Sequence, residues 1–352
     1  MSKIERAVQG IGDLDQRAMA AARERLDQLT KPPGSLGVLE ELAVQLAGIS
    51  GNPMPAARDK VVVVMAGDHG VVEEGVSAFP SEVTPQMVYN FIRGGAGINV
   101  LARQAGARVI VVDLGVAAEI NHPGLINRKV RYGTGNIARE PAMSREEAVR
   151  AVVAGIEVAE EEIKNGAEIL ATGDMGIGNT TPSSAILAAF SGLPVRRVVG
   201  RGTGVDDRRL ELKVRAIERA LELHRPDPRD PLDVLSKVGG LEIAGLAGVI
   251  LGAAAARRPV VIDGFISGAA ALVAGRMEPK AIKYMIASHV SQEPGHRIIM
   301  EMLDLKPMLQ MKMRLGEGTG AALAFHLIEA ATRIIREMAT FADAGVSGAI
   351  DA

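Results

Sequence analysis

Short runs of apolar, β-branched residues recur along the middle of the chain and predict buried strands. The clearest run, at 60–66, holds four consecutive valines without polar alternation. A strand that is apolar at every position is usually buried on both faces, as in a parallel sheet. Similar runs lie at 108–113, 168–172, 259–263 and 283–287, and a shorter one lies at 197–199. The pattern therefore predicts about six strands.

Apolar residues at helical spacing occupy the segments between these runs. The segments cover 84–106, 144–166, 182–190, 207–223 and 241–257. Strands that alternate with helices predict an α/β fold, doubly wound, with a mainly parallel six-stranded Rossmann-like sheet.

Both ends of the chain are predicted to be helical. Residues 13–29 and 35–49 alternate charged and apolar positions, and 321–338 has apolar residues at helical spacing. A chain of 352 residues also exceeds the roughly 250–300 at which a single core stops growing. We expect 1–55 and 325–352 to form a small helical domain, and 56–324 to form a large α/β catalytic domain.

The composition argues against nucleic acid as a partner. Aromatic residues are only 3% of the chain, with no Trp, so stacking on bases is an improbable main activity. The net charge of −2 supplies no overall surface for binding a polyanion. Hydrophobic residues reach 47%, which is enough for a substantial core.

Several other classes of site have no support in the sequence. The chain has no Cys, which excludes disulfides, thiolate metal sites and Cys nucleophiles and fits a cytoplasmic protein. None of the six His forms a compact ligand pair, so we expect no metal and no cofactor. The start of the chain is charged and polar, and 244–256 is too short and too rich in Gly and Ala to span a bilayer. We therefore expect no membrane partner.

Glycine and polar residues follow nearly every predicted strand. They lie at 67–70, 173–181, 200–204, 263–264 and 288–289. In open α/β sheets, ligands bind outside the carboxyl ends of the strands. We therefore predict a small-molecule site along that edge of the sheet.

The loop at 176–181 is the best candidate for binding a phosphate. Gly176 and Gly178 free backbone N–H groups, and Asn179 and Thr180 add side-chain donors. Pro182 starts a helix whose N-terminus would face the ligand. The alternative is an ordinary capped helix start.

A second glycine loop also runs into a predicted helix. It contains Gly202, Thr203 and Gly204, and the helix carries Lys213. Lys213 is a candidate to reach a phosphate as a point charge, although a lone helix lysine is usually solvated.

Two aspartates, Asp174 and Asp263, end predicted strands next to glycine. Either carboxylate is suited to accept hydrogen bonds from ribose hydroxyls. His69 follows the first predicted strand, and the sequence leaves open whether it packs, caps or catalyses.

Glu317 stands between Gly316 and Gly318, just before the predicted helix at 321–338. The plain interpretation is a tight turn whose acid favours the helix dipole. A carboxylate beside apolar residues such as Leu315 also suits a general base, because its surroundings tune its pKa.

Five motifs together resemble one enzyme family. The motifs lie at 31–37, 65–71, 173–181, 200–204 and 316–322, and the similarity runs in order from about residue 10 to about residue 340. The chain resembles the nicotinate-nucleotide–dimethylbenzimidazole phosphoribosyltransferase family.

The resemblance implies an activity and an assembly. Such an enzyme moves the phosphoribosyl group of nicotinate mononucleotide to 5,6-dimethylbenzimidazole and releases nicotinate. The product, α-ribazole 5'-phosphate, belongs to the lower-ligand branch of cobalamin biosynthesis, and C1 of the ribose is inverted. The family uses no metal and is a homodimer. Two helical segments with few charges, 241–257 and 264–277, also need burial in the core or against a partner.

The resemblance also implies roles for residues. Glu317 falls on the catalytic base of the family, and 176–181 falls on its phosphate loop. The family often has Glu where this chain has Asp174, which makes a direct contact by this shorter side chain doubtful. The remaining substrate-binding candidates are Ser291 and Arg314, and a slot for the base from Phe79, Pro80, Gln86, Met87 and Leu315.

Two other functions stay open at the level of sequence. An NAD-dependent oxidoreductase requires GxGxxG directly after a strand, and no predicted strand has it. A non-catalytic nucleotide-binding module gives no reason for a carboxylate inside a glycine loop. The preferred base, whether a benzimidazole, a purine or a phenol, is not indicated by the slot residues.

Overall fold

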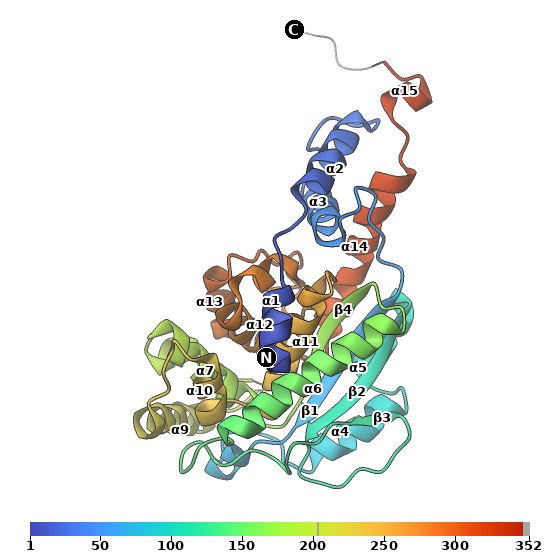
Figure 1. The fold of residues 1–352 in the computed structure, drawn as a ribbon. Helices are drawn as coiled ribbons and strands as arrows, with labels where there is room; N and C mark the ends of the chain where they lie inside the picture. Colours follow the sequence, from blue (N-terminus) through green and yellow to red (C-terminus); the bar gives the residue numbers. More distant parts are fainter. Residues whose placement is uncertain (203, 348–352) are drawn as a thin grey trace.

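The computed structural model describes residues 1–202 and 204–347 and contains one sheet of six strands. The strands are all parallel and lie in the order β3-β2-β1-β4-β5-β6 (Figure 1). Their bounds are β1 (Lys60–Gly67), β2 (Ala107–Gly115), β3 (Leu125–Asn127), β4 (Ile169–Met175), β5 (Val260–Ile262) and β6 (Met285–Ala287). The predicted α/β fold with a parallel six-stranded sheet is confirmed.

One of the six predicted strands is wrong, and one strand was missed. The run at 197–199 belongs to helix α8 (Val195–Val198), which begins after Pro194 and buries Val195 and Val198 three positions apart. A three-residue β-branched run is too short to decide its own structure, and the proline favours a helix start there. The missed strand, β3, is an equally short segment that pairs with β2 inside the long connection at 116–140.

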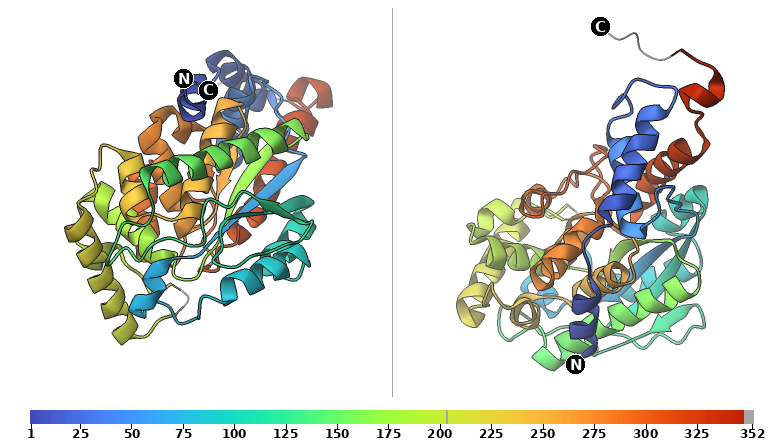
Figure 2. Two further views of the ribbon diagram at one scale, coloured as in Figure 1. Left: turned by 60° about the horizontal axis from the view of Figure 1, so that its bottom comes forward. Right: turned by 45° about the horizontal axis from the view of Figure 1, so that its top comes forward.

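Two cores lie on the two faces of the sheet. Val61, Val63 and Met65 of β1 point into one core, with α6 (Arg145–Lys164), α11 (Leu241–Ala255) and α12 (Phe265–Met277). The alternate residues of β1 point into the other core, with α4 (Val83–Ile92), α5 (Gly97–Ala105) and α14 (Thr319–Glu337). Figure 2 shows the sheet between these helical layers. Burial on both faces explains why β1 is apolar throughout.

The segment at 84–106 is two helices instead of the single one expected. Gly94, with φ of 79°, and Gly95 separate α4 from α5. A left-handed residue ends a helix readily when it is glycine. The break gives α5 a new N-terminus, which becomes important at the site.

Helix α11 is buried along almost its whole length by the chain itself. A Cβ added to Gly155 of α6 would lie 1.9 Å from the carbonyl oxygen of Gly245, so only glycine permits this close approach. Helix α12 packs beside α11 and is buried as well. Both helices are therefore buried within a single chain, so their lack of charged residues is no longer evidence for a homodimer.

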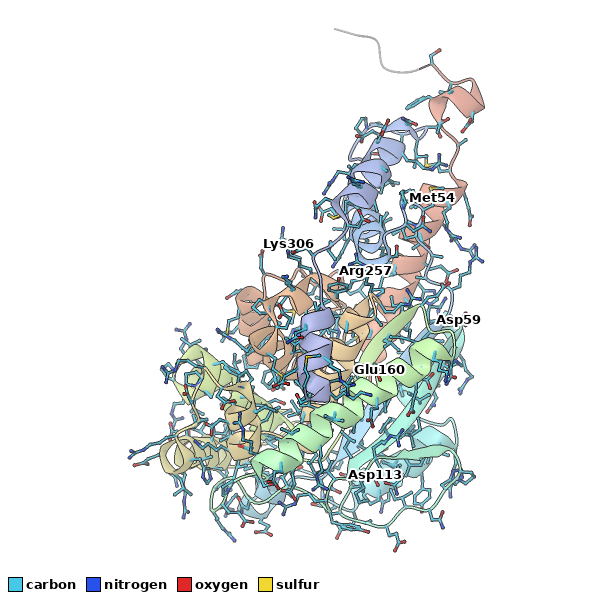
Figure 3. The ribbon with its side chains drawn as sticks, viewed as in Figure 1. Met54, Asp59, Asp113, Glu160, Arg257 and Lys306 are labelled. Atoms are coloured by element: carbon cyan, nitrogen blue, oxygen red, sulfur yellow. The ribbon has the colours of Figure 1, made fainter. Side chains whose placement is uncertain are left out.

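The ends of the chain meet in a helical bundle that stands away from the sheet (Figure 1). The bundle contains α2 (Gln16–Gln28), α3 (Val38–Ser50) and the later part of α14, with α15 (Phe341–Ala344) beyond it. Helix α1 (Lys3–Gly10) instead packs on α6 and α11 of the α/β body. Arg257, labelled in Figure 3, joins the two parts by donating to the carbonyl oxygens of Gly48 and Asp13. The division at 55 and 325 stays a prediction.

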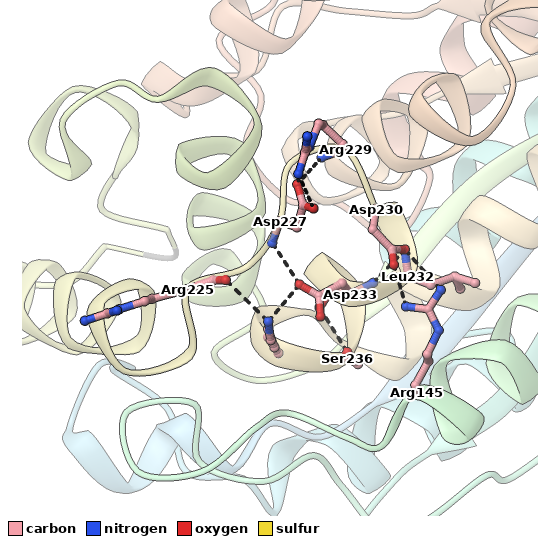
Figure 4. A network of polar contacts seen from close by, with 9 residues as sticks. Arg145, Arg225, Asp227, Arg229, Asp230, Leu232, Asp233 and Ser236 are labelled. Atoms are coloured by element: carbon pink, nitrogen blue, oxygen red, sulfur yellow. Dashed lines mark hydrogen bonds and ion pairs between the residues drawn. The ribbon is translucent and has the colours of Figure 1, made fainter.

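Helix α9 (Asp207–His224) is fastened to its neighbours by a polar network (Figure 4). Asp230 caps α10 (Pro231–Val238) and pairs with Arg145 at the start of α6. Lys237 donates to Asp233 and to the carbonyl oxygen of Arg225, the residue that ends α9.

The remaining helices are η1 (Gly70–Glu74), α7 (Thr180–Ser191), η2 (Pro279–Tyr284) and α13 (Pro294–Met302). Within the described ranges, we find no helix that is both long and apolar enough to cross a membrane.

Candidate active site

The loop that carries Glu317 is held in an unusual conformation. Gly316, Glu317 and Gly318 all have positive φ, at 80°, 62° and 93°. A non-glycine residue rarely adopts this left-handed geometry, and it does so where the surroundings fix it. Asp263 provides the fixing contacts, since its carboxylate accepts hydrogen bonds from the N–H groups of Gly318, Gly320 and Ala321 at 3.1, 2.7 and 3.0 Å.

The Glu317 side chain is oriented by α5, a helix that is distant from the Glu317 loop in the sequence. Its Oε2 accepts a hydrogen bond of 3.1 Å from the N–H of Ile98, in the first turn of α5. Only 6% of Glu317 is exposed, and this burial raises the pKa of its carboxyl, while the N–H groups of Ile98 and Gly97 act in the opposite direction. The interpretation that Glu317 merely serves the dipole of α14 is wrong, because Asp263 occupies that helix end.

Two glycines allow this loop to lie against the sheet. A Cβ added to Gly173 of β4 would lie 2.4 Å from the carbonyl oxygen of Glu317. A Cβ added to Gly320 would lie 1.9 Å from Nδ1 of His289. Neither position has room for another residue type, so the glycines that marked the loops in the sequence are required by packing.

Asp174 lies beside the Glu317 loop. Its Oδ2 accepts a hydrogen bond of 2.9 Å from the Asn179 side chain, and both of its oxygens lie 3.2 Å from a Cβ built on Gly316. Its Oδ1 is buried and finds no hydrogen-bond partner among residues 1–202 and 204–347. Burial raises the pKa of Asp174 well above its usual range, and the charges of Asp263 and other carboxylates add to this.

The contacts of Asp263 differ from those expected of a residue that binds ribose hydroxyls. Both of its oxygens accept backbone hydrogen bonds from the Glu317 loop, and its side chain is 1% exposed. Burial raises the pKa of Asp263 to about 7, against the effect of these N–H donors. Its contacts position the loop that carries Glu317.

The two predicted phosphate loops meet around Lys213. The Lys213 Nζ donates to Oγ1 of Thr180 at 2.5 Å and to the carbonyl oxygen of Gly200 at 3.1 Å. Lys213 is 1% exposed, and burial lowers its pKa to about 8. It is therefore not the solvated helix lysine of the alternative interpretation. One small cavity is lined by Gly176, Gly178, Asn179, Thr180, Arg201, Gly202 and Lys213, among others.

The second loop is brought only partly to this cavity. Gly202 lines it, and a Cβ built on Gly202 would lie 3.0 Å from Oγ1 of Thr180. Gly204, with φ of 113°, is exposed and does not line it. Thr203 lies outside the described residues.

A buried His–Glu pair lies next to the start of the phosphate loop. The His69 Nε2 lies 2.8 Å from Oε1 of Glu242, and both side chains are almost fully buried. Burial alone would lower the pKa of His69, but the carboxylates of Glu242 and Asp68 raise it overall. A Cβ on Gly176 would lie 3.0 Å from this Nε2, so His69 supports the start of the phosphate loop.

The described residues contain no group of three or more His, Cys, Asp or Glu arranged to hold a metal ion. Glu317, Asp174, Glu242 and Asp263 each have at least one carboxylate oxygen in a hydrogen bond with backbone, Asn179 or His69.

Comparison with known proteins identifies the family of this site. A family model described as a phosphoribosyltransferase matches residues 11–346. The chain belongs to the nicotinate-nucleotide–dimethylbenzimidazole phosphoribosyltransferase family. A protein of that name from Desulforamulus reducens is 63% identical over 335 residues, which is 95% of each chain. Another, from Chloroflexus aggregans, is 61% identical over 348 residues, which is 99% of each chain.

A solved structure of the same name agrees with this assignment. It comes from Thermus thermophilus, is 51% identical, and superposes with a TM-score of 0.91 over 96% of this chain and 100% of that one. The family resemblance that the five glycine-containing motifs indicated is therefore confirmed.

Of the residues expected to form a slot for the base, only some have contacts that link them to Glu317. Leu315, which is 59% exposed, lies against Gly97 at the start of α5 and so beside Glu317. Phe79, Pro80 and Gln86 are exposed on or just before α4, whereas Met87 is half-buried and packs into the core between the sheet and α14. Leu315 is thus the slot candidate with a direct link to the proposed base.

The last two candidates lie in loops between β6 and α14. Ser291 is buried, and its Oγ accepts a hydrogen bond of 3.3 Å from the N–H of Glu293. Arg314 is exposed, and its charge acts on the pKa of Glu293. Their binding to substrate stays a prediction.

The structure adds a positioning residue that no sequence motif marked. Thr84 of α4 is fully buried, and its Oγ1 accepts a hydrogen bond of 3.1 Å from the N–H of Ile177 in the phosphate loop. Its contact partner lies 93 positions away, so no local pattern carries it.

We expect Thr84→Val to lower the free energy of unfolding by about 1–3 kcal/mol, because it leaves the Ile177 N–H buried without a partner. Chemical denaturation of the purified proteins measures this change. Thr84→Ser keeps the hydroxyl and should recover part of the loss. Equal stability of the Val variant and the wild type would contradict the assigned hydrogen bond.

Proposed function

We propose that this chain transfers the phosphoribosyl group of nicotinate mononucleotide to 5,6-dimethylbenzimidazole. Nicotinate leaves, and α-ribazole 5'-phosphate forms. The observation that carries the proposal is the buried Glu317 carboxylate, held between two left-handed glycines and aimed at the N-terminus of α5. The names of its full-length relatives support the same reaction.

The chemistry requires few groups. Nicotinate is attached as a pyridinium, so it leaves C1 of the ribose with the bonding electrons and needs no acid. One benzimidazole nitrogen forms the new bond to C1, and the other gives up its proton to Glu317. Attack on the face opposite to nicotinate converts the β-nucleotide into an α-product. The loops would position both substrates and exclude water, which would otherwise give ribose phosphate.

The phosphate would bind to the loop at 176–181, near Gly202 and Lys213. The N-terminus of α7 and the Lys213 ammonium both favour an anion there. Helix α7 begins at Thr180, whose hydroxyl already bonds Lys213 and would be shared with a ligand.

Incubation of the purified protein with both substrates tests the activity. Chromatography should detect nicotinate and α-ribazole 5'-phosphate in equal amounts, and omission of either substrate should abolish both. Binding of nicotinate mononucleotide without turnover would indicate a nucleotide-binding module instead. A saturable change in NADH fluorescence on titration with the protein would favour the oxidoreductase.

We also propose a homodimer, on the ground of family membership alone, and a location in the cytoplasm, which the absence of Cys fits. Sedimentation at micromolar concentration should give about twice the chain mass of 36.9 kDa. A single-chain mass at that concentration would contradict it.

A further inference from the structure

Glu293 is a buried acid that the proposed reaction does not use. It precedes α13, is 6% exposed, and its Oε2 has no hydrogen-bond partner within the described part of the chain. An ionisable side chain that is buried and only partly satisfied is costly unless an opposite charge lies near it.

The opposite charge is Lys213, and the two side chains share a neighbour. The carbonyl oxygen of Gly200 accepts the hydrogen bond from Lys213 Nζ, at 3.1 Å. A Cβ on Gly200 would lie 2.1 Å from Oε2 of Glu293, so this carboxylate lies directly against the same residue. Glycine at 200 therefore leaves room for the carboxylate beside the residue whose carbonyl oxygen binds the ammonium.

We propose that Glu293 is the internal counter-ion of Lys213, which keeps the ammonium charged in the ligand-free protein and so preserves its affinity for the nucleotide phosphate. Glu293 does not line the phosphate cavity, but two residues that do line it, Lys213 and Gly202, act on its carboxylate, and it is through Lys213 that we assign it a positioning role. The part that concerns phosphate affinity depends on the function proposed above.

The electrostatics of the pair agree with this assignment. Burial lowers the pKa of Lys213 to about 8, and Glu293 is the charged group that opposes this effect. Burial raises the pKa of Glu293, and the attraction of Lys213 opposes that shift in turn. Each charge therefore supports the ionised form of the other.

The other charged groups around the pair have separate contacts. Arg201 lines the same cavity and pairs with Asp207 at the start of α9. Arg314 acts on Glu293 from the loop before α14. Neither guanidinium favours a charged Lys213, which leaves Glu293 as the acid suited to that role.

The variant Glu293→Gln keeps the shape and removes the charge. The pKa of Lys213 should then fall by about one unit, because a nearby carboxylate no longer favours the ammonium. An NMR titration of the ligand-free protein with ¹³C-labelled lysine measures this pKa directly, and Lys213→Met assigns the signal. Glu301→Gln, a change of an exposed acid on the same α13, is the matched control and should leave the pKa unchanged.

The affinity for nicotinate mononucleotide should follow the same titration. Calorimetry from pH 6.5 to 9 should show equal affinities of the wild type and Glu293→Gln at pH 6.5, where Lys213 is charged in both. At pH 8 to 9 the variant should bind roughly three- to tenfold more weakly, because more of its Lys213 is neutral. Glu293→Asp keeps the charge and should restore part of the loss.

Two outcomes would overturn the proposal: an unchanged pKa of Lys213 in Glu293→Gln, or a loss of affinity that is the same at every pH. The second would mean that Glu293 only supports the loop. If the pKa shifts as expected and the wild type transfers no phosphoribosyl group, the proposed function fails and the counter-ion assignment stands.

Discussion

Replacement of Glu317 by Gln should lower kcat by about 10²–10⁴-fold, the usual contribution of a general base. Gln has nearly the same shape and can stay against the first turn of α5, where Glu317 now accepts the Ile98 N–H. It cannot accept the benzimidazole proton. Because the change affects the chemical step, KM for nicotinate mononucleotide should stay within a few-fold of the wild type. Steady-state kinetics of the two proteins measure both quantities.

The control for this variant is Glu337→Gln, an exposed change at the end of α14, the helix that follows the Glu317 loop. It should have wild-type kinetics. If Glu317→Gln retains near-full kcat, Glu317 only orients the base, and the proton leaves to water or to a carboxylate such as Asp174. A large rise in KM together with the fall in kcat would show that the variant has disturbed the loop instead.

The second large effect is expected at Lys213. A lost charge-assisted contact costs about 1.5–3 kcal/mol, so Lys213→Ala should raise KM for nicotinate mononucleotide by roughly 10- to 100-fold. Lys213→Met should act in the same way and fill more of the space, since the side chain is 1% exposed. In both variants kcat at saturation should change little, because the phosphate keeps the same contact in the ground state and in the transition state, and the loss of such uniform binding raises KM alone.

A substrate without a phosphate separates binding from folding in this experiment. Nicotinate riboside should be bound equally by the wild type and by Lys213→Met, whereas the mononucleotide should distinguish them. Lys164→Met, at an exposed position near the end of α6, serves as the control. An unchanged KM for the mononucleotide would mean that Lys213 has only a structural role, through its hydrogen bonds to Thr180 and Gly200.

The parts of the site that are formed by residues close together in the sequence could be predicted from it. In the loops that contain Asn179, Thr180 and Glu317, the glycines and the polar residues are close neighbours in the sequence. A local pattern of this kind predicts a tight turn with N–H groups that can bind an anion, or a turn that presents an isolated acid. The buried strands were equally visible where they are long, as in β1, because burial on both faces leaves an unbroken apolar run.

The parts that depend on distant contacts were not accessible. The Ile98 N–H reaches Glu317 across 219 positions, and Asp263 reaches Ala321 across 58, so neither contact leaves a local pattern. The burial of Lys213 also follows from packing against loops from elsewhere in the chain, and a helix position alone suggests the opposite. Three-residue segments such as β3 and four-residue ones such as α8 are decided by their neighbours.

The most direct test of the role of Glu317 compares two nucleophiles. Dimethylbenzimidazole must lose a proton as it reacts, whereas its N-methyl derivative attacks through the other nitrogen and has no such proton to lose. The ratio of kcat for the wild type to kcat for Glu317→Gln should be about 10²–10⁴ with the first nucleophile and close to one with the second. A ratio that is equally large for both nucleophiles would contradict Glu317 as the proton acceptor.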